Sequence, residues 1–309
     1  SDDLEGCQHS FIEILANSVD EAREGYGDKI IVKKYSDLSI EVEDFGRGIP
    51  MDYNAKEGRY NWELVYCELY AGGKYNNNSS GDYEFSLGLN GLGACATQYS
   101  SEYMDVEVHR DGYKYTLHFE KGENIGGLTK EPYTKKDTGS TIRWKPDLEV
   151  FTDINIPHEY YRDMLHRQAI VNKNLRFILR IEQDKGFTTE EFLYENGIAD
   201  YLHEKVGEHA MTDMQFWTGE DIGRDRADMQ DYKVKFNVVM CVSNRVSLQE
   251  YYHNSSWLEN GGSPEKAVRS AFVAQVDAYL RQNGKYLKNE SKISYQDVQD
   301  CLVLISSSF

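Results

Sequence analysis

The stretch that decides the fold of this chain reads Asp44-Phe45-Gly46-Arg47-Gly48-Ile49-Pro50. It follows the apolar alternation of residues 38–44, so a predicted strand ends in a carboxylate and continues into two closely spaced glycines, which allow close backbone approach to a ligand. Taken alone, the stretch is equally typical of a strand followed by a Gly-Pro turn. The alternative is a binding site. A buried aspartate could accept a hydrogen bond from an adenine amino group, and a ligand without that group would leave the carboxylate unpaired.

A polar stripe marks the helix that we predict for residues 8–25. Glu13 and Asn17 lie one turn apart on the same helix face, about 6 Å along the axis. Taken alone, this pattern is more typical of a solvated helix face. The alternative is chemical: a carboxylate near a phosphorus atom can orient or deprotonate an attacking water. An amide beside it could be a ligand of a Mg²⁺ ion. Such an ion needs only one or two protein ligands when nucleotide phosphates supply the others.

Two glycine-rich segments and a strand start complete the set of motifs. The segment Ala71-Gly72-Gly73-Lys74 offers a positive charge, and Gly88-Leu89-Asn90-Gly91-Leu92-Gly93 leads into a predicted helix. Glycines before a helix present backbone N–H groups to an anion, although a flexible surface loop with a helix cap has the same pattern. The spacing matches neither a Walker loop nor a Rossmann fingerprint. In Thr138-Gly139-Ser140-Thr141, a hydroxyl residue enters a strand, which alone favours an ordinary strand start.

The periodicity of the whole chain predicts an α+β protein with about two domains in 309 residues. We predict helices at residues 8–25, 61–70, 91–100, 158–172, 197–206 and 266–283. We predict strands at residues 29–34, 38–44, 103–110, 113–120, 139–146, 174–182, 214–218, 232–242 and 301–305. A long loop is expected at residues 72–93. We place the domain boundary between residues 148 and 149, giving domains 1–148 and 149–309.

Composition excludes several classes of protein. The 52 acidic residues outnumber the 34 basic ones, and the formal net charge of −18 argues against broad, non-specific binding to nucleic acid or anionic lipid. No apolar run approaches the ~18 residues of a membrane span. The five cysteines are scattered, which indicates reduced thiols in a cytoplasmic protein and not a disulfide frame or zinc site.

Taken together, the order and spacing of the motifs resemble the ATPase region of the B subunit of bacterial type IIA topoisomerases, that is, DNA gyrase and topoisomerase IV. Residues 13–22, 44–50, 71–74 and 88–93 carry this resemblance, which extends over essentially the whole chain. It implies a GHKL-type ATP-binding domain, with the Bergerat sandwich of helices on a mixed sheet, followed by a smaller α/β transducer domain. The implied activity is ATP hydrolysis with Mg²⁺ that powers DNA strand passage. The implied partners are an A subunit, DNA and, on ATP binding, a second copy.

The resemblance assigns the phosphate end of the site. It implies that Glu13 is the general base for water attack on the γ-phosphate, that His9 supports it, and that Asn17 ligates Mg²⁺. The remaining residues implied in holding the phosphates are Lys74, Leu89, Asn90, Gly91, Leu92 and Gly93.

The resemblance also assigns the base end. Asp44 would recognise the adenine amino group, with Gly48 and Ser140 in its hydrogen-bond network. Arg47 and Glu21 would form a pair at the adenine edge, where the guanidinium can cover the base. Ile49 and Pro50 would wall the pocket, and Arg110 matches a position that contacts aminocoumarin inhibitors in the family.

The chain departs from the family pattern at several positions. Ala16 stands where aspartate is common, Phe45 replaces a common second acidic residue, and Ser140 replaces threonine. The family's N-terminal arm would precede Ser1 and its Gln-Thr-Lys loop would follow Phe309, so we expect a mostly monomeric chain with slow turnover. Two alternatives remain from other classes: a nucleotide-gated clamp or chaperone-like module with little hydrolysis, and a degenerate homologue that no longer binds ATP.

Overall fold

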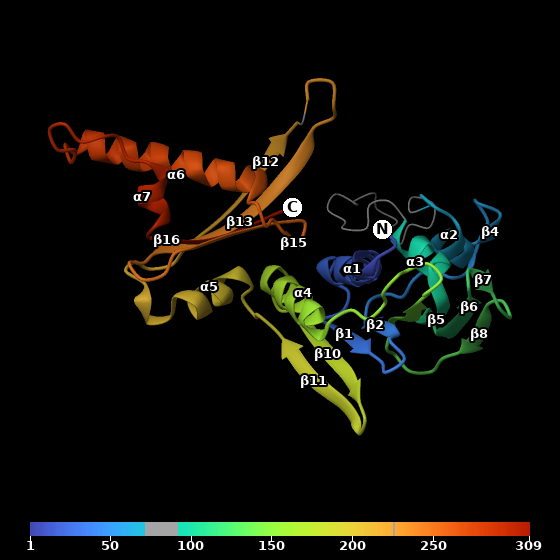
Figure 1. Cartoon of the computed structure of the whole chain (residues 1–309). Helices are drawn as coiled ribbons and strands as arrows, with labels where there is room; N and C mark the ends of the chain where they lie inside the picture. Colours follow the sequence, from blue (N-terminus) through green and yellow to red (C-terminus); the bar gives the residue numbers. More distant parts are fainter. Residues whose placement is uncertain (72–91, 225) are drawn as a thin grey trace. The chain divides into compact units, whose positions relative to one another are not determined.

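A computed structural model describes residues 1–71, 92–224 and 226–309, which form two compact units (Figure 1). The first unit comprises Ser1–Ala169 and Asn174–Leu193, and the second comprises Ile170–Lys173 and Tyr194–Phe309. The predicted loop at residues 72–93, together with Lys74, Leu89, Asn90 and Gly91, falls almost wholly outside the described residues.

The first unit combines helices with one large mixed sheet. Its helices are α1 (Leu4–Arg23), α2 (Asn61–Cys67), α3 (Gly93–Tyr99) and α4 (His158–Val171), whose last two residues count with the second unit. Its strands are β1 (Lys29–Lys34), β2 (Ile40–Asp44), β3 (Tyr53–Asn54), β4 (Arg59–Tyr60), β5 (Ser101–Arg110), β6 (Tyr113–Glu120), β7 (Glu123–Asn124), β8 (Thr129–Pro132), β9 (Gly139–Pro146), β10 (Arg176–Gln183) and β11 (Gly186–Phe192).

The described strands of this unit, apart from the small β3–β4 pair, form a nine-stranded sheet in the order β11-β10-β1-β2-β9-β5-β6-β7, with β8 also paired to β6. β1 runs parallel to β10 and antiparallel to β2. The predicted hairpin between β5 and β6 is confirmed. Its two turn residues, Asp111 and Gly112, have φ angles of 53° and 79°, as a two-residue turn of the right twist requires.

One face of this sheet is apolar and lies under helices. Because successive side chains of a strand alternate between faces, the register aligns buried residues in rows across the strands. One row runs Val32, Val42, Ile142, Val106 and Leu117. The helix α1 contributes its own apolar stripe to this core, namely Cys7, Phe11, Ile14, Leu15, Ala16, Ser18 and Val19. The core therefore lies between α1 and the centre of the sheet.

The second unit is an α/β layer structure of its own. Its helices are α5 (Ile198–Val206), α6 (Gly262–Gln282) and α7 (Tyr295–Gln299), with a 3₁₀ turn, η2, at Gly207–His209. Its strands are β12 (Gln215–Gly223), β13 (Tyr232–Val242), β14 (Leu248–His253), β15 (Ser256–Trp257) and β16 (Leu302–Ser308), in the sheet order β12-β13-β16-β14-β15.

Helices cover both faces of this second sheet, as Figure 1 shows with α5 on one side of β16 and α6 on the other. Val303 and Ile305 of β16 belong to the buried cluster that contains Leu202 of α5. Leu302 and Leu304 instead belong to the cluster lined by α6 and α7. Since both faces are buried, β16 is an unbroken apolar run through Ile305, as the sequence predicted.

The predicted α+β class is confirmed, and the compact units divide later than the boundary that we placed at 148/149. The first unit extends to Leu193 because β10 pairs in parallel with β1 along its full length, from Lys29↔Arg176 to Lys34↔Ile181. The polar strands β8 and β11 and the short α7 carry little apolar alternation, so the sequence pattern missed them.

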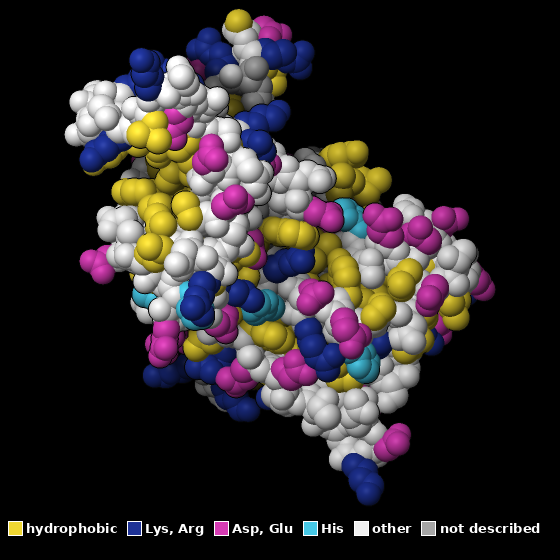
Figure 2. Space-filling view, turned by 60° about the vertical axis from the view of Figure 1, so that its left-hand side comes forward, with side chains coloured by type: hydrophobic (Ala, Val, Ile, Leu, Met, Phe, Trp, Pro, Cys, Tyr) yellow, Lys and Arg dark blue, Asp and Glu magenta, His cyan; other side chains and the backbone are white. Residues whose placement is uncertain are grey.

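Charge is dispersed over the molecule. On the face that Figure 2 shows, acidic and basic side chains lie interspersed. The described residues form many ion pairs, such as Lys121 with Glu149 at 2.7 Å. Within the described part of the chain, no helix has the length and apolar character that a bilayer crossing requires.

The two-sided burial of β16 gives a stability prediction. Ile305 is fully buried, whereas Ile222 on β12 is 66% exposed. Ile305→Ala should lower the free energy of unfolding of the second unit by about 2–5 kcal/mol, because it removes buried methyl groups and leaves a cavity. The matched change Ile222→Ala should stay within about 0.5 kcal/mol of the parent. Urea unfolding measures both, and equal effects would contradict this packing.

Candidate functional site

The carboxylate of Asp44 lies at the end of β2 in an otherwise apolar row, opposite Ile30 of β1. Three groups donate hydrogen bonds to it. The Ser18 hydroxyl of α1 donates to Oδ2 at 2.7 Å, and the backbone N–H groups of Gly46 and Ser140 donate to Oδ1 at 3.0 and 3.3 Å. A carboxylate can accept about four hydrogen bonds, so within the described part of the chain these three leave one acceptor position.

Burial dominates the electrostatics of this group. Removal from water raises the pKa of Asp44 from 3.8 to about 6, while the hydrogen bonds from Ser18, Gly46 and Ser140 act in the opposite direction. Near pH 6, the carboxyl group therefore exchanges between the ionised form, which only accepts hydrogen bonds, and the protonated form, which can also donate one. This is the electrostatic setting of a specific polar contact and not of a surface carboxylate.

Ser18 is a site residue that our sequence analysis did not single out. It occupies the apolar stripe of α1 at helical spacing from Phe11, Ile14 and Leu15, and it is 5% exposed. A hydroxyl residue in such a stripe needs a buried partner, and Asp44 supplies it. A polar position inside an apolar helix face was thus the signal that could have found it.

Ser140 and Gly48 connect the carboxylate to the turn after β2. The Ser140 hydroxyl accepts a hydrogen bond from the Ile49 N–H at 2.9 Å, while the Ser140 N–H is the donor to Asp44. The Gly48 carbonyl accepts a hydrogen bond from Arg110 Nη1 at 2.7 Å. Hydrogen bonds therefore link Asp44, Ser140 and Ile49 to one another, and Gly48 to Arg110. Pro50, the other predicted wall residue, follows Ile49 directly and is half-buried.

Glu21 and Arg47 form the predicted pair. Glu21 Oε2 accepts from Arg47 Nε at 3.1 Å and Oε1 accepts from Nη2 at 2.6 Å, so the ion pair is bidentate. The hydrogen bond with Glu21 raises the pKa of the Arg47 guanidinium above its ordinary value.

Glu13 lies on the part of α1 that meets α3. Its Oε1 lies 3.4 Å from Nε2 of His9, one turn earlier, and the Glu13 side chain is 34% exposed. A Cβ atom added at Gly93, the first residue of α3, would lie 2.4 Å from Glu13 Oε2, so only glycine fits there. Asn17 is exposed one turn after Glu13, and Leu92 precedes α3 as its N-cap. Helix α3 thus begins against the predicted base.

The described ranges contain no group of three or more His, Cys, Asp and Glu side chains arranged to hold a metal ion. A divalent cation at Asn17 would therefore take most of its ligands from a bound anion and from water. That arrangement suits Mg²⁺, which keeps several waters and accepts one or two protein ligands beside phosphate oxygens.

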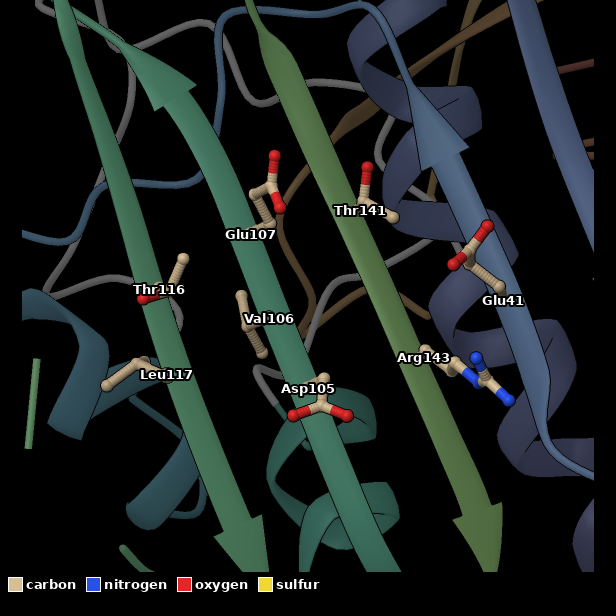
Figure 3. A pocket seen from close by; sticks show the side chains of 8 residues that line it. All are labelled: Glu41, Asp105, Val106, Glu107, Thr116, Leu117, Thr141 and Arg143. Atoms are coloured by element: carbon tan, nitrogen blue, oxygen red, sulfur yellow. The ribbon is translucent and has the colours of Figure 1, made fainter. Parts of the chain in front are cut away.

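A shallow pocket of about 250 Å³ lies on the opposite, polar face of the same sheet (Figure 3). Its lining residues are Glu41, Asp105, Val106, Glu107, Thr116, Leu117, Thr141 and Arg143. Their charged groups are paired within the protein: Glu41 with Lys33 at 3.4 Å, and Glu107 with His109 at 2.8 Å. We therefore place the candidate site at Asp44, on the helix-covered face, and not in this pocket.

Comparisons with known proteins agree with this architecture. Residues 197–309 match the family model for DNA gyrase B. The topoisomerase 4 B subunits of Staphylococcus epidermidis and Staphylococcus aureus are each 30% identical to the chain over 310 residues, which is 99% of this chain and 45% of the relative. The chain thus spans about half the length of these curated relatives.

Two solved structures are similar along nearly the whole chain. One is the 43K ATPase domain of Thermus thermophilus gyrase B in complex with an aminocoumarin, with a TM-score of 0.74 and 26% identity, covering 100% of this chain and 77% of that one. The other is the topoisomerase IV ATP-binding domain of Francisella tularensis with a small-molecule inhibitor, with a TM-score of 0.70 and 26% identity, covering 97% and 76%.

These matches define the class: the fold is that of the ATPase region of type IIA topoisomerases. The chain is a relative of the gyrase and topoisomerase IV B subunits, so the resemblance drawn from the sequence is confirmed.

The raised pKa of Asp44 predicts a pH dependence of stability. A carboxyl group whose pKa is about 6 when folded and 3.8 when unfolded binds more protons in the folded state, so its charging destabilises the fold as pH rises through that window. The loss by pH 7 is about 3 kcal/mol. Asp44→Asn can keep the acceptor Oδ1 and donate from Nδ2 to Ser18, so it should gain about that much relative to the parent between pH 4 and pH 7.

Chemical unfolding at the two pH values measures this difference. Asp184→Asn, a change at an exposed carboxyl in the β10–β11 turn, is the control and should shift far less. A difference between Asp44→Asn and the parent that stays constant from pH 4 to pH 7 would contradict the burial of a charged Asp44.

Proposed function

We propose that this chain binds ATP at the site formed by α1, β2 and β9, and that it hydrolyses ATP as the nucleotide-binding part of a type IIA topoisomerase B subunit. The first compact unit would be the ATP-binding domain and the second the transducer domain. The observation that carries the proposal is the buried Asp44 carboxylate, which three donors hold in place with one acceptor position left. An adenine amino group could donate a hydrogen bond to this remaining acceptor position.

Specificity for adenine follows from the cost of leaving that position unpaired. A base with a carbonyl oxygen in place of the amino group would set acceptor against acceptor in a buried site, which is strongly unfavourable. Ser140, Gly48 and Ile49 would hold the carboxylate and the adjoining turn rigid. Arg47, fixed by Glu21, would cover the base. Pro50 would wall the pocket, and Arg110, bonded to the Gly48 carbonyl, would lie at its rim.

For hydrolysis, Glu13 would accept a proton from the attacking water while the bond between the γ-phosphorus and the bridging oxygen breaks. His9, 3.4 Å away, would orient this carboxylate. Asn17 would hold Mg²⁺, which neutralises phosphate charge when it is bound. Lys74 and the backbone of residues 89–93 would hold the phosphates, and Gly93 supports this placement because α3 begins against Glu13.

The wider role would be that of the relatives. In an intact protein, nucleotide-driven dimerisation would power DNA strand passage together with an A subunit in the cytoplasm. The global charge of −18 is compatible with that role, because this part of the protein would handle nucleotide and leave DNA cleavage to other domains.

Nucleotide binding can be tested directly by thermal unfolding. A non-hydrolysable ATP analogue with Mg²⁺, at about 100 times its dissociation constant, should stabilise the folded chain by about 2.7 kcal/mol. The GTP analogue should raise the unfolding temperature much less, because guanine carries a carbonyl oxygen where adenine carries the amino group. If neither analogue raises the unfolding temperature, the chain is a degenerate homologue and the proposal fails.

The role of Glu13 gives a second test. Glu13→Gln should keep the affinity for the ATP analogue but slow single-turnover phosphate release by about 10²–10⁴-fold, the usual contribution of a general base. Glu5→Gln on the same helix is the control and should leave both quantities unchanged. If Glu13→Gln releases phosphate at the parent rate, Glu13 is not the general base. Binding without release in the parent chain would instead favour a nucleotide-gated clamp.

A further inference from the structure

The Arg47 guanidinium has further contacts besides its ion pair with Glu21. Its Nη2 also donates to Glu24 Oε2 at 2.9 Å, and its Cζ lies 4.1 Å from the centroid of the Tyr26 ring. In addition, the Arg47 backbone N–H donates to Glu21 Oε2 at 3.1 Å. Two carboxylates thus engage the nitrogen atoms of the guanidinium, and its central carbon lies over the face of an aromatic ring.

These contacts restrict different motions of the same group. The bidentate bond to Glu21 fixes the in-plane direction of the fork. A second carboxylate on Nη2 resists rotation away from that direction. An aromatic face at 4.1 Å selects the tilt of the plane, because a cation is attracted to the centre of the ring. The three contacts together restrict the position of the guanidinium beside the Tyr26 ring.

Backbone hydrogen bonds at the end of α1 hold Tyr26 close to the Glu21–Arg47 ion pair. Helix α1 ends at Arg23, and the Tyr26 N–H donates to the Glu21 carbonyl at 3.1 Å, while the Gly25 N–H donates to Ala22. Gly25 has a φ of +95°, the left-handed conformation of a glycine that closes a helix. The same helix end therefore presents Glu21, Glu24 and Tyr26 to Arg47.

We propose that Tyr26 and Glu24 are positioning residues of the nucleotide site, which hold Arg47 so that the guanidinium face opposite Tyr26 stacks on the purine. This inference rests on the proposed ATP-binding function. Tyr26 acts through Arg47, since its ring lies against the guanidinium face that the base does not use. The base would then complete a sandwich of ring, guanidinium and purine.

The test measures affinity for the non-hydrolysable ATP analogue by isothermal titration calorimetry. Tyr26→Leu should weaken binding about two- to fivefold, in line with a partly exposed cation–π contact, and Tyr26→Phe should restore it because it keeps the ring face. Glu24→Gln should also weaken binding. Tyr35→Leu is the matched control, since the Tyr35 ring lies 3.5 Å from Arg143 Cζ on the opposite face of the sheet. It should leave the affinity unchanged.

A double-mutant cycle separates positioning from mere packing. In an Arg47→Gln background, Tyr26→Leu should cause no further loss of affinity, because the group through which it acts is gone. An equal loss in both backgrounds, or parental affinity in Tyr26→Leu alone, overturns the inference while leaving ATP binding intact. A parent chain that does not bind the analogue overturns the proposed function, and this inference with it.

Discussion

The structure depends on one constraint, the burial of the Asp44 carboxylate in an apolar row of the sheet. The strict alternation of β2 places Asp44 on the same face as Ile40 and Val42, so the position cannot move to solvent without turning the whole strand over. Its three hydrogen bonds come from three segments far apart in the chain: Ser18 on α1, Gly46 after β2 and Ser140 on β9. The helix layer and the sheet are thus fixed to each other at the candidate site.

Much of this arrangement was accessible from the sequence, because it depends on local periodicity. Periodicity predicted the bounds of several elements to within a few residues, namely strands β1, β2, β5, β6 and β9 and helices α1, α4 and α5. The family resemblance, and not periodicity, singled out Gly48, Ile49 and Ser140; Ser140 reaches Asp44 because β9 pairs with β2, and Ile49 bonds to Ser140.

Other features were not predictable, because they depend on contacts between distant segments or on unpatterned strands. β10 joins the first sheet through a parallel pair with β1, a non-local contact that places Asn174–Leu193 in the first compact unit. β11 is an exposed edge strand without apolar alternation. Glu24 and Tyr26 lie at the end of the predicted helix and belong to none of the sequence motifs. Their importance depends on where the turn after β2 brings Arg47.

The contacts of Arg47 also bear on how an acidic protein could bind a polyanion. Glu21 and Glu24 both pair with Arg47, so two carboxylates meet one guanidinium and little positive charge remains at this end of the site. An arginine so compensated suits stacking on a neutral base better than attraction of phosphates. If the chain binds ATP as proposed, the charge of the triphosphate would have to be met elsewhere, and the family resemblance assigns that role to Lys74, to backbone N–H groups and to Mg²⁺. On the proposed function, separating base recognition from charge compensation would allow a chain of net charge −18 to select adenine by shape and hydrogen bonding, and its affinity would depend on a divalent cation.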